Sequence, residues 1–156
     1  MPDNRLSPTI QNRKARHNYH ILEEFEVGIM LTGTEIKSIR AGKISMGESF
    51  VTINKDIELF WHSANIDEYS HGNRYNHRPQ RIRKLLAHKH EILKMHKATE
   101  IKGLALVPLK LYFKNGFAKL QIALCRGKDN RDKRQNLIEK TQKREIDRAM
   151  KNARLR

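Results

Sequence analysis

The sequence has almost no cysteine and no long apolar run. Cys125 is its single cysteine, which excludes an internal disulfide and any zinc site made of several cysteines. No stretch approaches the roughly 18–20 apolar residues of a membrane span. The first eight residues, MPDNRLSP, lack the apolar core of a signal peptide. We therefore expect a cytoplasmic protein, and we expect Cys125, which lies in an apolar run, to be a small core residue.

Motifs for catalysis are also missing. The chain has no glycine-rich phosphate loop and no serine in a nucleophile elbow. His88, His90 and His96 lie close together in the sequence, but two zinc-binding histidines on one helix need a spacing of four, which none of these pairs has. We expect no metal, no cofactor and no enzymatic activity.

Positive charge is present in excess. The chain has 32 Lys and Arg against 17 Asp and Glu, a formal net charge of +15 in 156 residues. A surplus of this size predicts a polyanionic partner, which is either nucleic acid or an anionic membrane. The length predicts one domain that buries a core of its own.

The most complete local signal is a helix within Thr32–Lys43 (TGTEIKSIRAGK). Thr32 and Glu35 have the spacing of a capping box, which pairs the first backbone N–H groups of a helix with side chains. Gly42 can adopt the left-handed conformation that ends a helix. The two isoleucines between these signals lie on one face of the helix, and the basic residues lie on the other. We therefore expect a short amphipathic helix whose apolar face plugs a sheet and whose basic face is solvated.

Apolar residues alternate with polar ones over Tyr19–Leu31, which predicts a long half-buried strand interrupted at Gly28. A helix is the alternative for this stretch, because it contains Glu23 and Glu24. Before this strand, residues 12–19 (NRKARHNY) are basic. They form either a solvated approach to the strand or an arm that contacts phosphates. Residues 1–11 carry two prolines and little apolar content, and we expect a flexible leader there.

Two hairpins are predicted further along, from residues 50–53 with 57–61 and from residues 104–114 with 117–125. Asn115-Gly116 is the strongest short turn signal and makes the second hairpin the clearer one. Pro108 cannot donate a ladder hydrogen bond, so its strand should lie at an edge or contain a bulge there. Trp61 is expected in the core or as a lid on it, with base stacking as the alternative.

Residues 62–78 are polar and predict a surface loop, whose cations and aromatic residues suit an RNA surface as well as a solvated loop. Pro79 can introduce a helix, and the apolar spacing from Ile82 to Met95 predicts a helix that stops by Gly103. The other face of this helix would be basic and would carry Arg81, Arg83, Lys84, Lys89 and Lys94.

The last segment, residues 127–156, differs in character from the folded part, 12–126. Residues 128–156 hold eleven Lys or Arg, five Asp or Glu and five large aliphatic residues. Such a segment is disordered alone. A sparse apolar stripe from Ile138 to Ala153 predicts that it becomes helical on a partner, either RNA or an anionic membrane.

These elements describe a protein that is mainly β with helices. About five strands, a plugging helix, a second helix and a basic face are typical of a small barrel of the oligonucleotide-binding kind. The residues alone lead to RNA binding and no further.

Five sequence blocks follow one another along the chain: NRKARHNY (12–19), EEFEVGI (23–29), LTGTEIKSIRAGK (31–43), RKLL (83–86) and DKR (132–134) after a Gly-Lys pair. Together they resemble the SsrA-binding protein family, also called small protein B. The blocks occur in the family's order from residue 12 to the end of the chain. The resemblance implies a non-enzymatic adaptor that binds transfer-messenger RNA and brings it to ribosomes stalled on messages without a stop codon.

The resemblance also implies a six-stranded oligonucleotide-binding-like antiparallel β-barrel with about three short helices, which binds the tRNA-like domain of the RNA. Three matching positions fall on the family's RNA-contacting surface: Asn12, Glu26 and Leu86. The surrounding cations would attract phosphate, and they are Arg13, Lys14, Arg16, His17, Lys37, Arg40, Arg83 and Lys84. Glu26 would accept hydrogen bonds from bases or 2′-hydroxyls.

The family's tail becomes helical in the decoding centre of the small ribosomal subunit and in the empty message channel. The corresponding residues are Arg131, Asp132, Lys133, Arg134, Lys140, Lys143, Arg144, Arg148, Met150 and Lys151. Arg131 departs from the family, which often has His or Tyr there. We expect a monomer that binds one RNA and neither membrane nor DNA. The alternative is a general module for single-stranded or ribosomal RNA.

Overall fold

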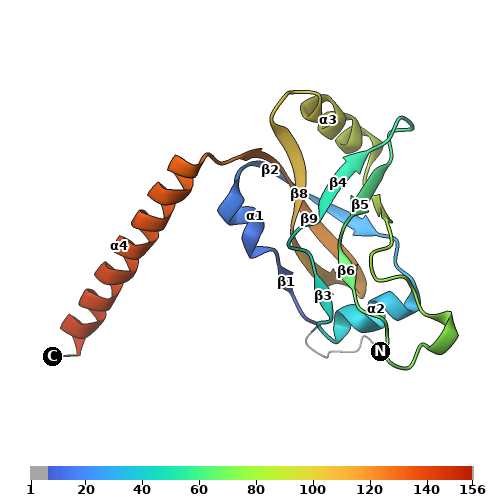
Figure 1. Cartoon of the computed structure of the whole chain (residues 1–156), viewed down its shortest axis with the longest axis horizontal. Coiled ribbons are helices and arrows are strands. Elements are labelled where there is room, and N and C mark those ends of the chain that lie inside the picture. The colour runs from blue at the N-terminus through green and yellow to red at the C-terminus, as the bar shows by residue number, and fades with distance from the viewer. Residues whose placement is uncertain (1–6, 156) are drawn as a thin grey trace. The chain divides into compact units, whose positions relative to one another are not determined.

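Six strands close into a ring in the computed structural model, which describes residues 7–155 (Figure 1). Around the ring the order is β8-β4-β5-β7-β2-β9, and β9 pairs again with β8. The strands are β2 (Tyr19–Ile29), β4 (Phe50–Ile53), β5 (Leu59–His62), β7 (Arg83–Leu86), β8 (Leu104–Lys114) and β9 (Phe117–Gly127). This confirms the six-stranded barrel and both predicted hairpins.

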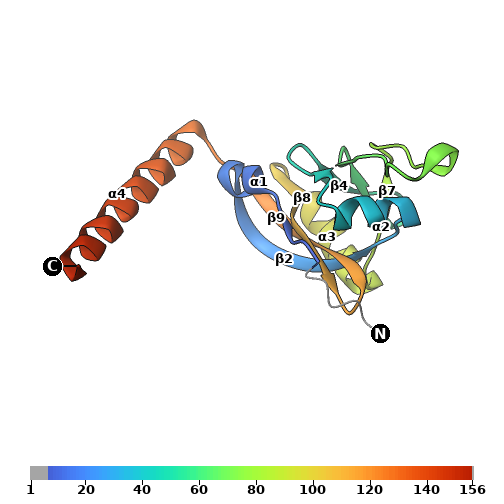
Figure 2. The same ribbon diagram turned by 90° about the horizontal axis from the view of Figure 1, so that it is seen from below.

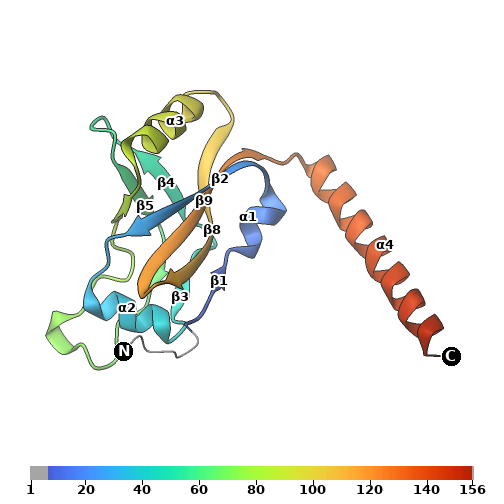
Figure 3. The same cartoon turned by 180° about the vertical axis from the view of Figure 1, so that it is seen from behind.

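Shorter elements complete the barrel unit. They are β1 (Ile10–Gln11), α1 (Arg13–Asn18), α2 (Gly33–Arg40), β3 (Ile44–Ser45), β6 (Asn65–Ile66), the 3₁₀ turn η1 (Asn73–Tyr75) and α3 (Lys89–Thr99). Helices α2 and α3 lie at opposite ends of the barrel, as Figures 1 and 3 show. The view in Figure 2 places α1 beside β8 and β9.

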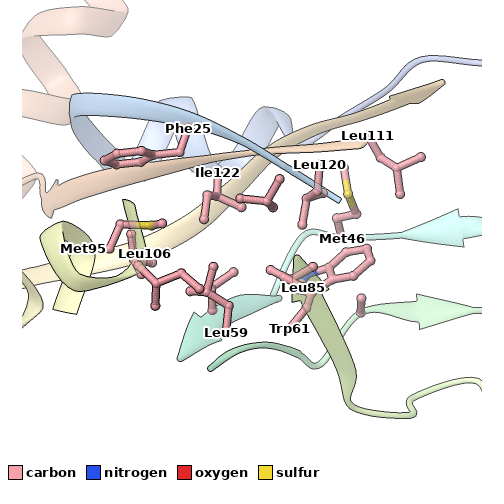
Figure 4. Close-up of a cluster of buried hydrophobic side chains, with 14 of the residues drawn as sticks. Phe25, Met46, Leu59, Trp61, Leu85, Met95, Leu106, Leu111, Leu120 and Ile122 are labelled. Atoms are coloured by element: carbon pink, nitrogen blue, oxygen red, sulfur yellow. The ribbon is translucent and has the colours of Figure 1, made fainter. Parts of the chain in front are cut away.

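The barrel interior is one apolar core (Figure 4). Its members come from every strand of the ring and from α2 and α3, and they include Phe25, Ile39, Val51, Leu59, Trp61, Leu85, Met95, Leu106, Leu120 and Ile122. Trp61 is fully buried, so its ring is a core group and cannot stack on a base.

A bulge in β8 places apolar side chains on both faces of this strand. The β8–β9 register shifts between Pro108 and Lys110, as expected from a proline that cannot donate. Leu106 and Leu111 therefore both enter the barrel core, although they are five residues apart. Leu109 packs in a second cluster with Ala15 of α1 and with Cys125. Cys125 is buried as predicted, and burial raises the pKa of its thiol to about 11.

Helix α2 forms as its sequence predicts. The backbone N–H of Thr32 donates to Oε2 of Glu35 at 2.9 Å, which is half of the expected capping box. Gly42 has φ +74° and follows Ala41, the C-cap residue of the helix. The side chain of Glu35 is completely buried, which the capping-box argument alone did not reveal.

Part of the predicted helix after Pro79 is wrong. Residues 83–86 form strand β7, which pairs with β2 and β5, and α3 begins only at Lys89. Within β7, Leu85 is buried in the core whereas Leu86 points outward and is half exposed. The neighbouring leucines thus alternate between the two faces of a sheet, and the helical spacing was a coincidence of two adjacent elements.

The N-terminal predictions also change. Residues 13–18, predicted as a solvated approach to the strand or as an arm that contacts phosphates, form helix α1, because the side chain of Asn12 caps the helix and Ala15 packs against β8. The expectation of a flexible leader is wrong at Ile10–Gln11, which pair with β8, and residues 1–6 lie outside the described residues. Strand β2 runs through Gly28 without interruption, which excludes the helical alternative there.

The chain divides into two compact units, and the second begins at Gly127. Its helix α4 (Asn130–Arg154) has 25 residues, none of them buried. At 1.5 Å per residue it is about 38 Å long. Its large apolar side chains, such as Ile146, are more than half exposed. Disorder of the isolated tail stays a prediction. Among residues 7–155, no helix is both long and apolar enough to cross a membrane.

Candidate nucleic-acid interface

Glu26 lies on the outer face of β2 and is held by two side chains of β8. The hydroxyl of Tyr112 donates to Oε2 of Glu26, and the ammonium of Lys114 lies 3.4 Å from Oε1. The Tyr112 hydrogen bond and the charge of Lys114 lower the pKa of Glu26. Partial burial and Glu26 raise the pKa of Tyr112 to about 12. At neutral pH the carboxylate is therefore ionised, oriented and free to accept further hydrogen bonds.

Leu86 lies on the same face as Glu26. It pairs in register with Gly28, two residues along β2 from Glu26. Glu26 and Leu86 line one cavity of about 500 Å³ together with His88, Glu91 and Lys119, among others. The structure thus brings together two of the three positions that the family resemblance selected.

Asn12, the third position, is elsewhere and is only 4% exposed. Its amide N–H groups donate to the carbonyls of Met46 (3.2 Å) and Pro108 (2.9 Å), and its Oδ1 accepts from the N–H of Ala15. Both polar atoms of its side chain are thus engaged inside the protein. We therefore correct its assignment: Asn12 fixes the start of α1 against β8, and its side chain is not available to RNA.

Arg83 is a second correction. Its side chain is 0% exposed, and its Nε lies 2.8 Å from Oε1 of the equally buried Glu35. Its two terminal nitrogens also donate, Nη1 to the backbone carbonyls of Ala64 and Arg81 and Nη2 to that of Pro79. A guanidinium in this position holds the barrel together and cannot contact a phosphate. The adjacent Lys84 points outward and pairs with Glu58.

The predicted cations of α1 are all exposed, and they are Arg13, Lys14, Arg16 and His17. Arg16 lies 3.8 Å from Glu24, which is two residues before Glu26 on the same face of β2. Figure 3 shows α1 beside the sheet formed by β2, β9 and β8. The basic side of α1 therefore continues the face that carries Glu26.

The predicted cations of α2 are also exposed, but aromatic rings hold them. The guanidinium of Arg40 lies 5.3 Å from the ring centre of Phe113, and the ammonium of Lys37 lies 5.2 Å from that of Tyr69. In residues 7–155 neither Lys37 nor Arg40 forms an ion pair. Both positive charges are thus positioned and available to an anion.

The segment 62–78 contains more secondary structure than the predicted surface loop. His62 ends β5, and β6 pairs with β3. The ring of His77 is buried between the hydroxyl of Thr34 and the carbonyl of Ile66, at 2.9 Å from each. Tyr75 is exposed, with the guanidinium of Arg74 over its ring. This segment therefore connects α2 to the barrel and also presents an aromatic side chain.

Sequence reasoning missed the partners of Glu26. Tyr112, Lys114 and Lys119 alternate with apolar residues along the β8–β9 hairpin. That alternation was the available signal, but it did not show that β2 lies next to β9. The predicted tail residues all lie on α4.

The face around Glu26 combines one hydrogen-bond acceptor, the Glu26 carboxylate, with surrounding cations. An ionised carboxylate accepts from base amino groups and 2′-hydroxyls, and the surrounding ammonium and guanidinium groups attract phosphate. Among residues 7–155, no group of three or more His, Cys, Asp or Glu is arranged to hold a metal ion. The arrangement supports binding of folded RNA.

Comparisons with known proteins agree with this assignment. A family model described as SmpB protein matches residues 9–152. The SsrA-binding protein of Shouchella clausii is 57% identical over 141 residues, which are 90% of each chain. That of Bacillus subtilis is 53% identical over 143 residues, which are 92% of this chain and 91% of the relative. A chain of the solved structure described as "tmRNA-SmpB: a journey to the center of the bacterial ribosome" is 48% identical with a TM-score of 0.67, and the match covers 79% of this chain and 86% of that one. The family match includes the whole barrel and nearly all of α4.

Proposed function

The chain belongs to the SmpB family of SsrA-binding proteins, and from this membership we propose that it is an RNA-binding adaptor and not an enzyme. It binds transfer-messenger RNA and delivers it to stalled ribosomes for trans-translation, in which the ribosome is released and its nascent peptide is tagged. Since ribosomes are its partner, it acts in the cytoplasm.

The face around Glu26 is our proposed site for the tRNA-like domain of the RNA. The observation that carries this proposal is the ionised Glu26 carboxylate, which Tyr112 and Lys114 orient on a basic surface. Leu86 supplies an adjacent apolar contact, and the cations of α1 and α2 supply phosphate attraction. Arg83 and Asn12 act from inside the protein, for the reasons given above.

Helix α4 is the proposed ribosome-probing element. Its residues Arg131–Arg134 and the further basic side chains up to Lys151 would enter the decoding centre and the message channel when no message fills them. Electrostatic attraction to ribosomal RNA phosphates favours entry, and a message already in the channel would block it. The chain would thus detect a missing codon without reading a base.

Competition at rising salt tests the function itself. We expect labelled transfer-messenger RNA to remain bound in a gel-shift assay when unlabelled bulk tRNA is added in excess and salt is raised from 50 to 200 mM. Binding through phosphate contacts alone would fall by about 10³–10⁵ over this range if six to ten contacts were made. A loss of that size, with equal competition by bulk tRNA, would identify a general RNA-binding module instead.

Reversing the charge of Glu26 tests the site. Glu26→Lys should weaken binding to the tRNA-like domain about 10- to 100-fold despite its added positive charge, because hydrogen bonds to a charged group are worth roughly 1.5–3 kcal/mol. The matched control is Glu24→Lys, which makes the same charge change two residues away on the same face of β2. It should bind as well as the wild type or slightly better. Tighter binding by Glu26→Lys would show that charge alone governs this face.

A further inference from the structure

A second cavity, of about 240 Å³, lies beside the Glu26 face and is mainly apolar. It is lined by, among others, Ile29, Leu31, Ile36, Leu86, Phe113 and Phe117. We propose that this cavity binds one unpaired nucleobase of the RNA, with Phe117 as its stacking partner. The inference rests on the proposed function and specifies what the site recognises.

The apolar side chains at the rim are unusually exposed. Phe117 is 70% exposed and Leu86 is 50% exposed. Met30, which follows the lining residue Ile29, is 51% exposed. Clustered exposed apolar side chains of this kind mark an interaction site. The backbone at Phe117 is positioned by the Asn115-Gly116 turn that precedes it, in which both residues have positive φ (52° and 79°) as in a type I′ hairpin.

The volume of the cavity and its aromatic lining favour a single flat ring. Pockets that hold drug-sized ligands measure about 300–1,000 Å³, and this cavity is smaller. It has aromatic side chains from both strands of one hairpin, Phe113 on β8 and Phe117 on β9. Aromatic faces of this kind stack on bases of any sequence, since every base has a π-face.

The polar groups around the cavity match the rest of a nucleotide. Lys119 lines both this cavity and the polar one that contains Glu26, and Gly28 and Leu86 are also shared. Arg40 lies over the ring of Phe113 and adds a second cation. A base in the apolar cavity would therefore have cations near its phosphates and the Glu26 carboxylate near its edge or its 2′-hydroxyl. An apolar peptide in the cavity would leave these cations and the Glu26 carboxylate without partners.

The test replaces Phe117 in the full-length protein and measures its affinity for a transcript of the tRNA-like domain. Phe117→Ala should weaken binding about 10- to 100-fold, the loss expected for one base–aromatic stack. Phe117→Tyr and Phe117→Trp should restore most of it. Ile101→Ala, which removes a similarly exposed apolar side chain near the end of α3, is the matched control and should have no effect. Thermal unfolding of each variant should be unchanged, since these side chains are exposed.

A fluorescent base locates the nucleotide. Placing 2-aminopurine at each unpaired position of the transcript in turn should give one position whose fluorescence changes when the wild-type protein binds and does not change with Phe117→Ala. Wild-type affinity of Phe117→Ala, or no responsive position, overturns the base-binding cavity while leaving the proposed function intact. If the wild-type protein itself prefers bulk tRNA, the proposed function fails, and this inference fails with it.

Discussion

A chain that ends at Gly127 should fold and bind transfer-messenger RNA with near-wild-type affinity, yet fail completely in ribosome rescue. Every member of the two apolar clusters lies at or before Cys125, so the barrel core is complete without the tail. The proposed RNA-binding residues also precede Gly127. We expect the affinity for the tRNA-like domain to change less than about threefold, which corresponds to ~0.7 kcal/mol.

Rescue would be measured in reconstituted translation of a message without a stop codon, as the fraction of peptide that receives the tag. The truncated chain should give no tagged peptide, because nothing would occupy the empty message channel. A full-length variant with Ile138→Pro and Ile146→Pro keeps every charge of the tail. Each proline costs about 3 kcal/mol in a helix interior, so this variant should also fail if the tail must be helical.

Comparing the truncated chain with the proline variant separates the effect of the tail's charge from the effect of its helical conformation. If the proline variant rescues as well as the wild type, the tail acts as a flexible cation and the proposed helical insertion is wrong. If the truncated chain loses its affinity for the RNA, the division of labour between barrel and tail is wrong. Circular dichroism of the free proteins supplies the remaining control, since it compares the helix content of the two full-length chains.

The barrel could be predicted from the sequence where local patterns specify it. The Asn115-Gly116 turn, the bulge at Pro108 and the helix after Thr32 each depend on the backbone preferences of one or two residues, and all three are present. Helix α1 could not be predicted in this way. It has six residues and depends on contacts of Ala15 and Asn12 with β8, about 95 residues away in sequence.

The site could be predicted only in part, for a related reason. Composition gave the partner class, and the family resemblance gave Glu26 and Leu86. The side chains that position Glu26 are 86 and 88 residues away in sequence and became visible only when β2, β9 and β8 were placed side by side. Charged residues are expected at the surface, so Arg83 was assigned to the RNA, although its partner Glu35 lies 48 residues earlier and both are buried.

Replacing Arg83 should therefore destabilise the fold instead of weakening RNA binding. Arg83→Met leaves the buried Glu35 with only Arg81 as a charged partner and removes the donors to three backbone carbonyls. Breaking a buried ion pair by removing one partner costs about 3–5 kcal/mol. Urea unfolding should show a loss of this size. Lys14→Ala removes an exposed ion pair with Glu48 and should change the free energy of unfolding little.

The pH dependence of this stability loss tests whether the Glu35 carboxylate is its cause. Burial alone would raise the pKa of Glu35, but the hydrogen bonds from Arg81 and Thr32 and the charge of Arg83 outweigh it and lower the pKa. A lowered pKa stabilises the fold above the unfolded value of about 4.3, and this contribution is lost as the pH falls through the folded pKa. In Arg83→Met the buried carboxylate is poorly compensated, and protonation relieves it. The difference in free energy of unfolding between the wild type and Arg83→Met should therefore become smaller from pH 7 to pH 4.

RNA binding then decides between the structural role and a phosphate contact for Arg83. Under conditions where Arg83→Met is still folded, its affinity for the tRNA-like domain should equal that of the wild type, and so should the slope of that affinity against salt. A phosphate contact would instead reduce the slope by about one. A variant with a reduced slope and unchanged stability would return Arg83 to the RNA-binding face, and it would mean that the pairing with Glu35 opens when RNA arrives.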